Sequence, residues 1–278
     1  MRRHILSSPA LPALCAVLLG ACASGGAATT PTTPEMPAPE ATARRGVPGF
    51  DTREYPGDSV MAVWRAASPY AWVGYYLESP CRPRSTWTGR RAALAEQGWG
   101  FAVLYVGEQQ WRDTTTHAPT PGEPLRCTRA NLTAEKGAAD AQDAQRVAQT
   151  EGFPAGARIF LNVERVDSIG TGLTGYVQAW VRTLLEGGTY IPALYAHAQN
   201  AAALYALFAA GFEARSAGSP ALWVARSGNF DIAAAPAESG FPEAVIWQGR
   251  FDVDETWGEA RVRIDVNVAD RASPSAPR

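Results

Sequence analysis

The chain has 278 residues, of which 46% are apolar, and its formal net charge is −2 at pH 7. This length and apolar content suffice for one large folded domain or two small ones. The acidic residues and arginines are scattered and form no basic cluster, which argues against nucleic acid as a partner.

The first 22 residues have the pattern of a bacterial export signal. Arg2 and Arg3 supply positive charge, and the mostly apolar stretch 5–21 is too short and too interrupted by proline to cross a bilayer permanently. The signal ends in Leu-Gly-Ala-Cys at 19–22, which resembles the lipoprotein box whose cysteine becomes acylated. We therefore expect export, lipidation of Cys22 and anchoring in the cell envelope. The outer membrane is favoured, facing the periplasm or the cell surface. An ordinary signal peptide with a stray cysteine is the alternative.

Residues 23–46 are rich in alanine, threonine and proline and contain no aromatic residue and no apolar period. Such a segment cannot bury enough apolar surface to fold, and its prolines stiffen it. The sequence therefore predicts a disordered tether that lets a folded domain reach the cell wall. We place that domain at 47–268 and a flexible tail at 269–278.

Apolar strand-like runs alternate with helix-like segments in the first part of the domain. The predicted strands are 47–51, 71–77, 99–106, 158–165, 190–197, 221–226, 244–248 and 260–268. The predicted helices are 58–67, 85–97, 133–151, 172–186 and 200–210. Five strand–helix units followed by three strands without helices predict an α/β fold, a TIM-like barrel of eight parallel-type strands. A doubly wound open sheet is the alternative, but no glycine-rich phosphate loop follows the first strand.

The predicted strand at 158–165 carries the most informative pattern. Side chains alternate between the two faces of a strand, so Phe160, Asn162 and Glu164 lie opposite the aliphatic residues between them. Helices before and after the strand indicate that its outer face is covered. We therefore expect Asn162 and Glu164 to point inward at the carboxyl end of the strand, where barrels of this kind place their chemistry. A purely structural role for Glu164 is the alternative.

Other predicted strands also end in polar residues that a barrel would gather in one mouth. These are Asp51, Glu78, Glu108, Tyr195, His197, Arg226, Gln248 and Asp265. Glycoside hydrolysis needs one protonated carboxyl group to protonate the leaving oxygen, and a second group as nucleophile, base or charge stabiliser. We assign Glu164 as the acid. Asp51 and Asp265 flank it on the first and last strands, which become neighbours when the barrel closes.

Several further residues are candidates for binding a sugar. The polar candidates are Glu78, Glu108, Tyr195, His197 and Gln248. The candidates for stacking on a sugar ring are Trp111, Trp223, Trp247 and Trp257. Plain core packing is the alternative for each tryptophan, and a buried hydrogen-bonded strut is the alternative for each strand-end acid.

Two cysteines remain in the predicted domain, Cys81 and Cys127, and they follow the second and third strands. Loops after neighbouring parallel strands emerge on one face, and export brings them into an oxidising compartment, so we predict a disulfide. Two free buried thiols are the alternative. The three histidines, His4, His117 and His197, have no metal-ligand spacing, so neither a metal nor a cofactor is expected.

Several motifs together resemble a bacterial glycoside-hydrolase-like domain of unknown function over 47–268. They are Gly-Phe-Asp-Thr at 49–52, the run 68–76, the helix that ends in Gly-Phe-Pro at 152–154, and the fourth strand. More distantly, they are similar to the glycoside hydrolase family 25 lysozymes, whose barrel also loses its last three helices. The resemblance implies an Asp-x-Glu pair on the fourth strand, with the glutamate as proton donor and the aspartate assisting the substrate's acetamido group. Glu164 matches the donor, and Asp51 and Asp265 match the acids of the first and last strands.

Asn162 stands where the resemblance implies an aspartate. An amide can bind an acetamido group, but it supplies no negative charge to a developing cation. Two interpretations follow: a weak or altered glycosidase that acts on peptidoglycan or a related amino-sugar polymer, or a cell-wall glycan-binding module without turnover. A third is an envelope scaffold that uses the outside of the barrel.

Overall fold

The computed structural model describes residues 45–110 and 127–277. The predicted export signal with Cys22, nearly all of the predicted tether, and Trp111 lie outside the described residues. Within the described part of the chain, no helix has the length and apolar character needed to cross a membrane.

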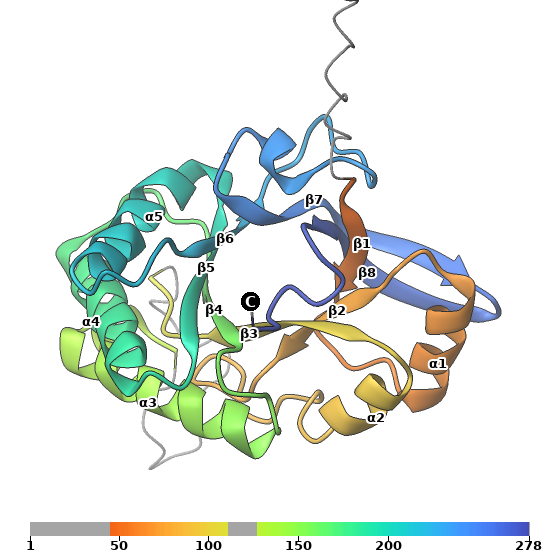
Figure 1. Ribbon diagram of the computed structural model, residues 1–278, viewed down its shortest axis with the longest axis horizontal. Helices are drawn as coiled ribbons and strands as arrows, with labels where there is room; N and C mark the ends of the chain where they lie inside the picture. Colours follow the sequence, from red (N-terminus) through yellow and green to blue (C-terminus); the bar gives the residue numbers. More distant parts are fainter. Residues whose placement is uncertain (1–44, 111–126, 278) are drawn as a thin grey trace, which may run out of the picture. The chain divides into compact units, whose positions relative to one another are not determined.

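Eight strands form a closed barrel in chain order, which confirms the predicted TIM-like α/β architecture (Figure 1). The strands are β1 (Val47–Asp51), β2 (Trp72–Tyr76), β3 (Gly100–Val106), β4 (Arg158–Val163), β5 (Ile191–His197), β6 (Ala221–Ala225), β7 (Ala244–Trp257) and β8 (Ala260–Ala269). Strands β1 to β7 pair in parallel, but β8 is antiparallel to both β7 and β1. The expectation of eight parallel strands is therefore wrong for β8. Two consecutive strands can pair in parallel only if a dozen or more residues connect them, and only residues 258–259 separate β7 from β8.

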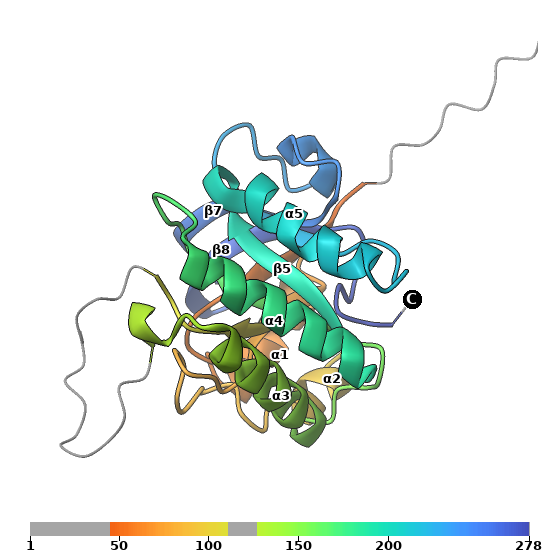
Figure 2. The same cartoon turned by 90° about the vertical axis from the view of Figure 1, so that its left-hand side faces the viewer.

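Five helices follow the first five strands, as the sequence pattern predicts. They are α1 (Asp58–Ala67), α2 (Arg91–Glu96), α3 (Ala134–Thr150), α4 (Thr171–Gly187) and α5 (Ala198–Glu213). Short 3₁₀ turns occupy Arg129–Asn131 and Pro236–Ser239. Helices α3, α4 and α5 lie side by side against the outside of the barrel, whereas the described residues after α5 form no α-helix (Figures 1 and 2). The predicted helix 85–97 forms only over its second half.

The barrel interior is a packed core below a polar mouth. The fully buried rings of Trp72, Phe160 and Trp223 meet edge to face inside it, with centroid distances of 5.8 and 5.7 Å from Trp223 to the other two. Ile159 and Leu161 belong instead to the larger core between the strands and the helices. The predicted alternation along β4 is therefore confirmed, and it places Asn162 on the inner face above Phe160.

The carboxyl-terminal segment is not a flexible tail, so that prediction is wrong. Ser275 is 2% exposed, its backbone N–H donates to Phe101 O over 2.9 Å, and its Oγ accepts from the backbone N–H of Val103 over 2.8 Å. Arg158 donates from its backbone to Ser275 O and from Nη1 to Pro274 O. The segment therefore supplies hydrogen-bond partners to backbone groups of β3 and β4. The small polar and proline residues of the segment do not indicate this role.

Candidate active site

Two carboxylates meet at the mouth of the barrel. Asp51 ends β1 and lies opposite Asp265 of β8 in the strand register. Gln248 Nε2 donates to Asp51 Oδ2 and to Asp265 Oδ2, over 2.9 Å in each case. The Nε2 atom of Gln248 thus bridges the two carboxylates. Asp265 reaches the mouth because β8 runs antiparallel, so that a residue in the middle of β8 pairs with the last residue of β1.

Hydrogen bonds from neighbouring side chains fix the position of the Asp51 carboxylate. It is 3% exposed, and it accepts hydrogen bonds from Tyr76 Oη over 2.6 Å and from Asn267 Nδ2 over 2.9 Å. Asn267 is oriented in turn by Trp223, whose Nε1 donates to Asn267 Oδ1 over 2.9 Å. A Cβ atom at Gly74 would lie 2.5 Å from Asp51 Cβ, so the site needs glycine there. These contacts preorganise Asp51.

The environment favours the protonated forms of both acids. Burial, and next the charge of Asp265, raise the pKa of Asp51 to about 7, although hydrogen bonds from its neighbours oppose the shift. Burial raises the pKa of Asp265 to about 6, against the hydrogen bond that the Asp252 backbone donates over 2.6 Å. Because the two groups titrate together, the pair retains a proton at mildly acidic pH.

Glu164 follows β4 and is half-buried at the same mouth. Its backbone N–H donates to Gln109 Oε1 over 3.2 Å, and Gln109 Nε2 donates to the carbonyl of Asn162 over 3.0 Å. After burial, the charge of Glu164 is the largest cause that raises the pKa of Tyr195, and it also contributes to the raised pKa of Asp265. The Glu164 carboxylate is therefore within electrostatic reach of the acid pair.

Asn162 is 5% exposed, and its Oδ1 is buried without a hydrogen-bond donor among the described residues. A buried acceptor without a donor costs free energy, so it calls for an explanation.

A cleft of about 490 Å³ extends from the acid pair toward the β7–β8 hairpin. Asp51, Tyr76 and Asp265 lie at its inner end, and Arg261 and Arg263 lie on the hairpin side. This volume is within the range of small-molecule binding sites. Among the residues that the structure describes, no group of three or more His, Cys, Asp and Glu side chains is arranged to hold a metal ion.

The family model for the Rv2525c-like, glycoside hydrolase-like domain matches residues 62–269. The chain belongs to this family. The match begins after β1, so the assignment of Asp51 rests on its geometry. No protein of curated function matches the sequence.

Three solved structures show how far the fold of this glycoside hydrolase-like domain is shared. An uncharacterized protein from B. stearothermophilus is 22% identical, with 81% of this chain and 97% of that chain covered and a TM-score of 0.53. The spore cortex lytic enzyme SleM from Clostridium perfringens is 13% identical, with coverages of 82% and 68% and a TM-score of 0.52. The modular autolysin LytC from Streptococcus pneumoniae is 11% identical, with coverages of 80% and 46% and a TM-score of 0.51. A spore cortex lytic enzyme and an autolysin thus share the fold of this chain.

Two of the four tryptophans predicted to stack on sugars, Trp223 and Trp247, do not face the mouth of the glycoside hydrolase-like domain. Trp223 is fully buried in the barrel interior, and Trp247 is 2% exposed on the outer side, where its Nε1 donates to Arg226 O over 2.9 Å. Neither ring has a free face, so these predictions are wrong. Trp257 lies on the β7–β8 hairpin, where its Nε1 donates to Glu255 Oε2 over 2.8 Å.

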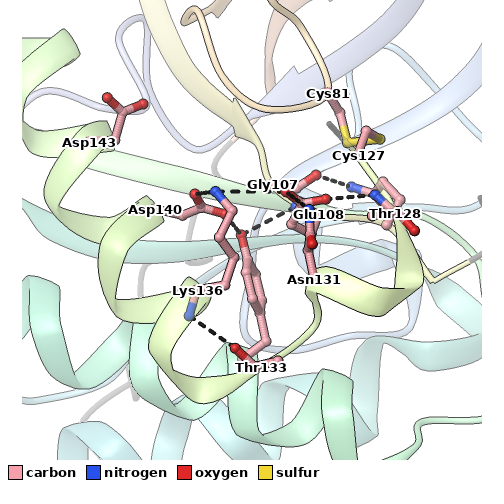
Figure 3. Close-up of polar contacts among 12 residues, drawn as sticks. Cys81, Gly107, Glu108, Cys127, Thr128, Asn131, Thr133, Lys136, Asp140 and Asp143 are labelled. Atoms are coloured by element: carbon pink, nitrogen blue, oxygen red, sulfur yellow. Dashed lines mark hydrogen bonds and ion pairs between the residues drawn. A yellow bond between two sulfur atoms is a disulfide. The ribbon is translucent and has the colours of Figure 1, made fainter. Parts of the chain in front are cut away.

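Glu108 is not in the mouth either, and its predicted contact with substrate there is wrong. Its carboxylate accepts from Thr128 N over 2.7 Å and from Asn131 Nδ2 over 3.1 Å, and it lies 3.7 Å from Lys136 Nζ (Figure 3). Glu78 and Glu108 line a separate cleft of about 550 Å³ beside α3, so the predicted contact of Glu78 with substrate at the mouth is wrong as well. Beyond the end of β3 the chain has turned outward, and the strand pattern no longer gives the direction of its side chains.

The predicted disulfide between Cys81 and Cys127 is confirmed, with the two Cα atoms 4.8 Å apart (Figure 3). It joins the segment after β2 to the start of the segment that leads into α3. His197 caps α5, because its Nδ1 accepts from the backbone N–H of Gln199 over 3.2 Å, and burial lowers its pKa. A contact between His197 and substrate stays a prediction.

Three residues of the site were not predicted, namely Tyr76, Gln109 and Asn267. The alternation of side chains along the strands indicates two of them as inward-facing residues. Tyr76 shares the inner face of β2 with Trp72, and Asn267 shares the inner face of β8 with Asp265. Gln109 lies beyond the end of β3, where no periodic signal exists.

Proposed function

We propose that this protein is an envelope-anchored glycoside hydrolase that cleaves peptidoglycan or a related amino-sugar polymer by carboxylate acid catalysis. One observation carries the proposal: Asp51 and Asp265 share the amide of Gln248 at the barrel mouth, with Glu164 in electrostatic reach. Glycoside hydrolysis requires this kind of convergence of acids that differ in environment.

The accessibility of the three acids suggests their roles. Glu164 and Asp265 are half-buried at the mouth, whereas Asp51 is 3% exposed and already accepts three hydrogen bonds. In this proposal Glu164 protonates the leaving oxygen, and Asp265 stabilises the oxocarbenium-like charge or accepts a proton from water. Asp51 acts from behind, because it titrates together with Asp265 and shares the Gln248 amide with it.

Two observations support an N-acylated amino sugar as the substrate unit. The first is the buried acceptor Asn162 Oδ1, which a sugar amide N–H would satisfy. The second is the set of proteins with a similar fold, which includes a spore cortex lytic enzyme and an autolysin solved with a synthetic peptidoglycan ligand.

The leader motif supports attachment to the envelope through lipid on Cys22, with the outer membrane favoured. Mass spectrometry of the protein purified from its native membrane tests this point. Acyl chains on an amino-terminal Cys22 are the expected result. An unmodified amino terminus directly after Ala21 would contradict the anchor.

The second candidate function is a cell-wall glycan-binding module with little or no turnover, and Asn162 is the observation that favours it. Purified peptidoglycan incubated with the wild type and with Glu164→Gln separates the two functions. Release of soluble muropeptides that is lost in the variant supports the hydrolase. Binding of both proteins to the polymer without any product supports the module.

A further inference from the structure

A second cleft, of about 440 Å³, lies at the end of the barrel opposite the acid pair. Ala71, Gly100 and Ala157, which line it, stand at or next to the first residues of β2, β3 and β4. Ser273 and Ser275 of the carboxyl-terminal segment complete the wall, and the lining is mainly apolar. None of the acids at the mouth borders this cleft.

Two arginines border this second cleft, and each lies on an aromatic ring. The guanidinium carbon of Arg65 is 5.7 Å from the centre of the Trp99 ring, and that of Arg91 is 5.3 Å from the centre of the Phe153 ring. Within residues 45–110 and 127–277, neither guanidinium has a carboxylate at ion-pair distance. The second cleft therefore combines an aromatic wall with positive charge that no acid of the described residues neutralises.

Trp99 and Arg91 also contribute buried hydrogen-bond donors that have no acceptor among the described residues. Trp99 is 3% exposed, and its Nε1 has no hydrogen-bond partner in the described part of the chain. Arg91 Nε is likewise buried without a partner there. Buried donors of this kind are rare because they lose their bonds to water without replacement. Both residues line the second cleft.

We propose that the second cleft binds a small organic carboxylate with an apolar body. The carboxylate accepts hydrogen bonds from Arg91 Nε and Trp99 Nε1, and the guanidinium groups balance its charge. The apolar body packs against Phe153 and the neighbouring apolar wall. The site is independent of the proposed hydrolysis, because it lies at the other end of the barrel.

Isothermal titration calorimetry on the whole chain tests the proposal, with hexanoate as the probe. Acetate keeps the charge without the apolar body, and hexan-1-ol keeps the body without the charge. We expect saturable binding of hexanoate, and binding of acetate and hexan-1-ol that is weaker by about tenfold or more, because each lacks one of the two contributions. Absence of saturable hexanoate binding, or equal binding of hexan-1-ol, would overturn the proposal.

Variants locate the binding. Arg91→Gln and Trp99→Phe each remove one unpaired donor, and we expect each to weaken hexanoate binding by about tenfold. Arg182→Gln removes an exposed arginine on α4 and is the matched control, with unchanged binding expected. Glu164→Gln should bind hexanoate like the wild type. Circular dichroism shows whether each variant is folded, and folded Arg91→Gln and Trp99→Phe that bind as tightly as the wild type would contradict the assignment.

Discussion

Tyr195 donates its hydroxyl hydrogen to Gln248 Oε1 over 2.7 Å, and this contact decides which end of the amide faces the acids. With Oε1 engaged, the amide nitrogen points at Asp51 and Asp265. The reverse orientation would place an amide oxygen against two carboxylates, which repel it. Tyr195 is thus a positioning residue that acts on the acid pair through Gln248.

The change Tyr195→Phe tests this positioning role. We expect kcat for peptidoglycan hydrolysis to fall by about tenfold, because the amide loses its fixed orientation and the acids lose a preorganised donor. One lost hydrogen bond should lower the free energy of unfolding by only about 1 kcal/mol. Tyr205→Phe on α5 removes a comparable hydroxyl, which donates to Pro220 O over 3.4 Å, and should leave kcat unchanged. An unaltered kcat in Tyr195→Phe would exclude the role.

The raised pKa values of the acid pair make stability depend on pH. The pKa of Asp51 is about 7 in the folded chain against 3.8 for the unperturbed group, so the folded state holds more protons between these values. The free energy of unfolding therefore falls as pH rises from 3.8 to about 7, and this contribution is largest at lower pH. Urea unfolding of the wild type and Asp51→Asn across this range measures it. The difference between the two proteins should shift in favour of the variant as pH rises, and a constant difference would contradict the raised pKa.

The change Asn162→Asp tests whether the missing charge limits catalysis. A carboxylate at this position would stabilise the developing positive charge, and we expect hydrolysis to become faster by about tenfold or more. Asn162→Ala, which removes the acceptor and adds no charge, should not increase the rate. Assays of released reducing ends compare the three proteins. Equal rates in the wild type and Asn162→Asp would mean that charge at position 162 does not limit the reaction.

The disulfide should contribute to stability because it closes a chain segment of 46 residues. The double change Cys81→Ser and Cys127→Ser should lower the free energy of unfolding by about 2–5 kcal/mol. Reduction of the wild type should lower the free energy of unfolding by a similar amount and should therefore lower the melting temperature. The double variant should not respond to the reductant. A wild type that melts at the same temperature with and without reductant would contradict this expectation.

The parts of the fold that depend on side-chain alternation could be predicted from the sequence. The inner position of Asn162 follows from the pattern along β4, and the closed barrel follows from the order of strands and helices. The same logic excludes Trp247 from the mouth once Gln248 is placed there, because adjacent residues of a strand face opposite sides. Alternation along β7 therefore suffices to place Trp247 on the outer side of the barrel.

Other features depend on backbone direction and on long-range pairing, which composition and period do not encode. Nothing in the pattern of 260–268 shows that β8 runs antiparallel, although the short connection after β7 points to it. The docking of Ser275 rests on backbone groups of β3 and β4, far away in sequence. Glu108 turns away because it lies past the end of its strand, where local turn geometry decides.

In the proposed reaction, Glu164 gives the proton that cleaves a glycosidic bond. The most direct measurement is mass spectrometry of soluble muropeptides released from purified peptidoglycan by the wild type, Glu164→Gln and Glu78→Gln. Glu78 is an exposed acid beside a different cleft and is the matched control. We expect products with new reducing ends from the wild type and Glu78→Gln, and none from Glu164→Gln, which still binds the polymer. Undiminished product from Glu164→Gln would contradict it.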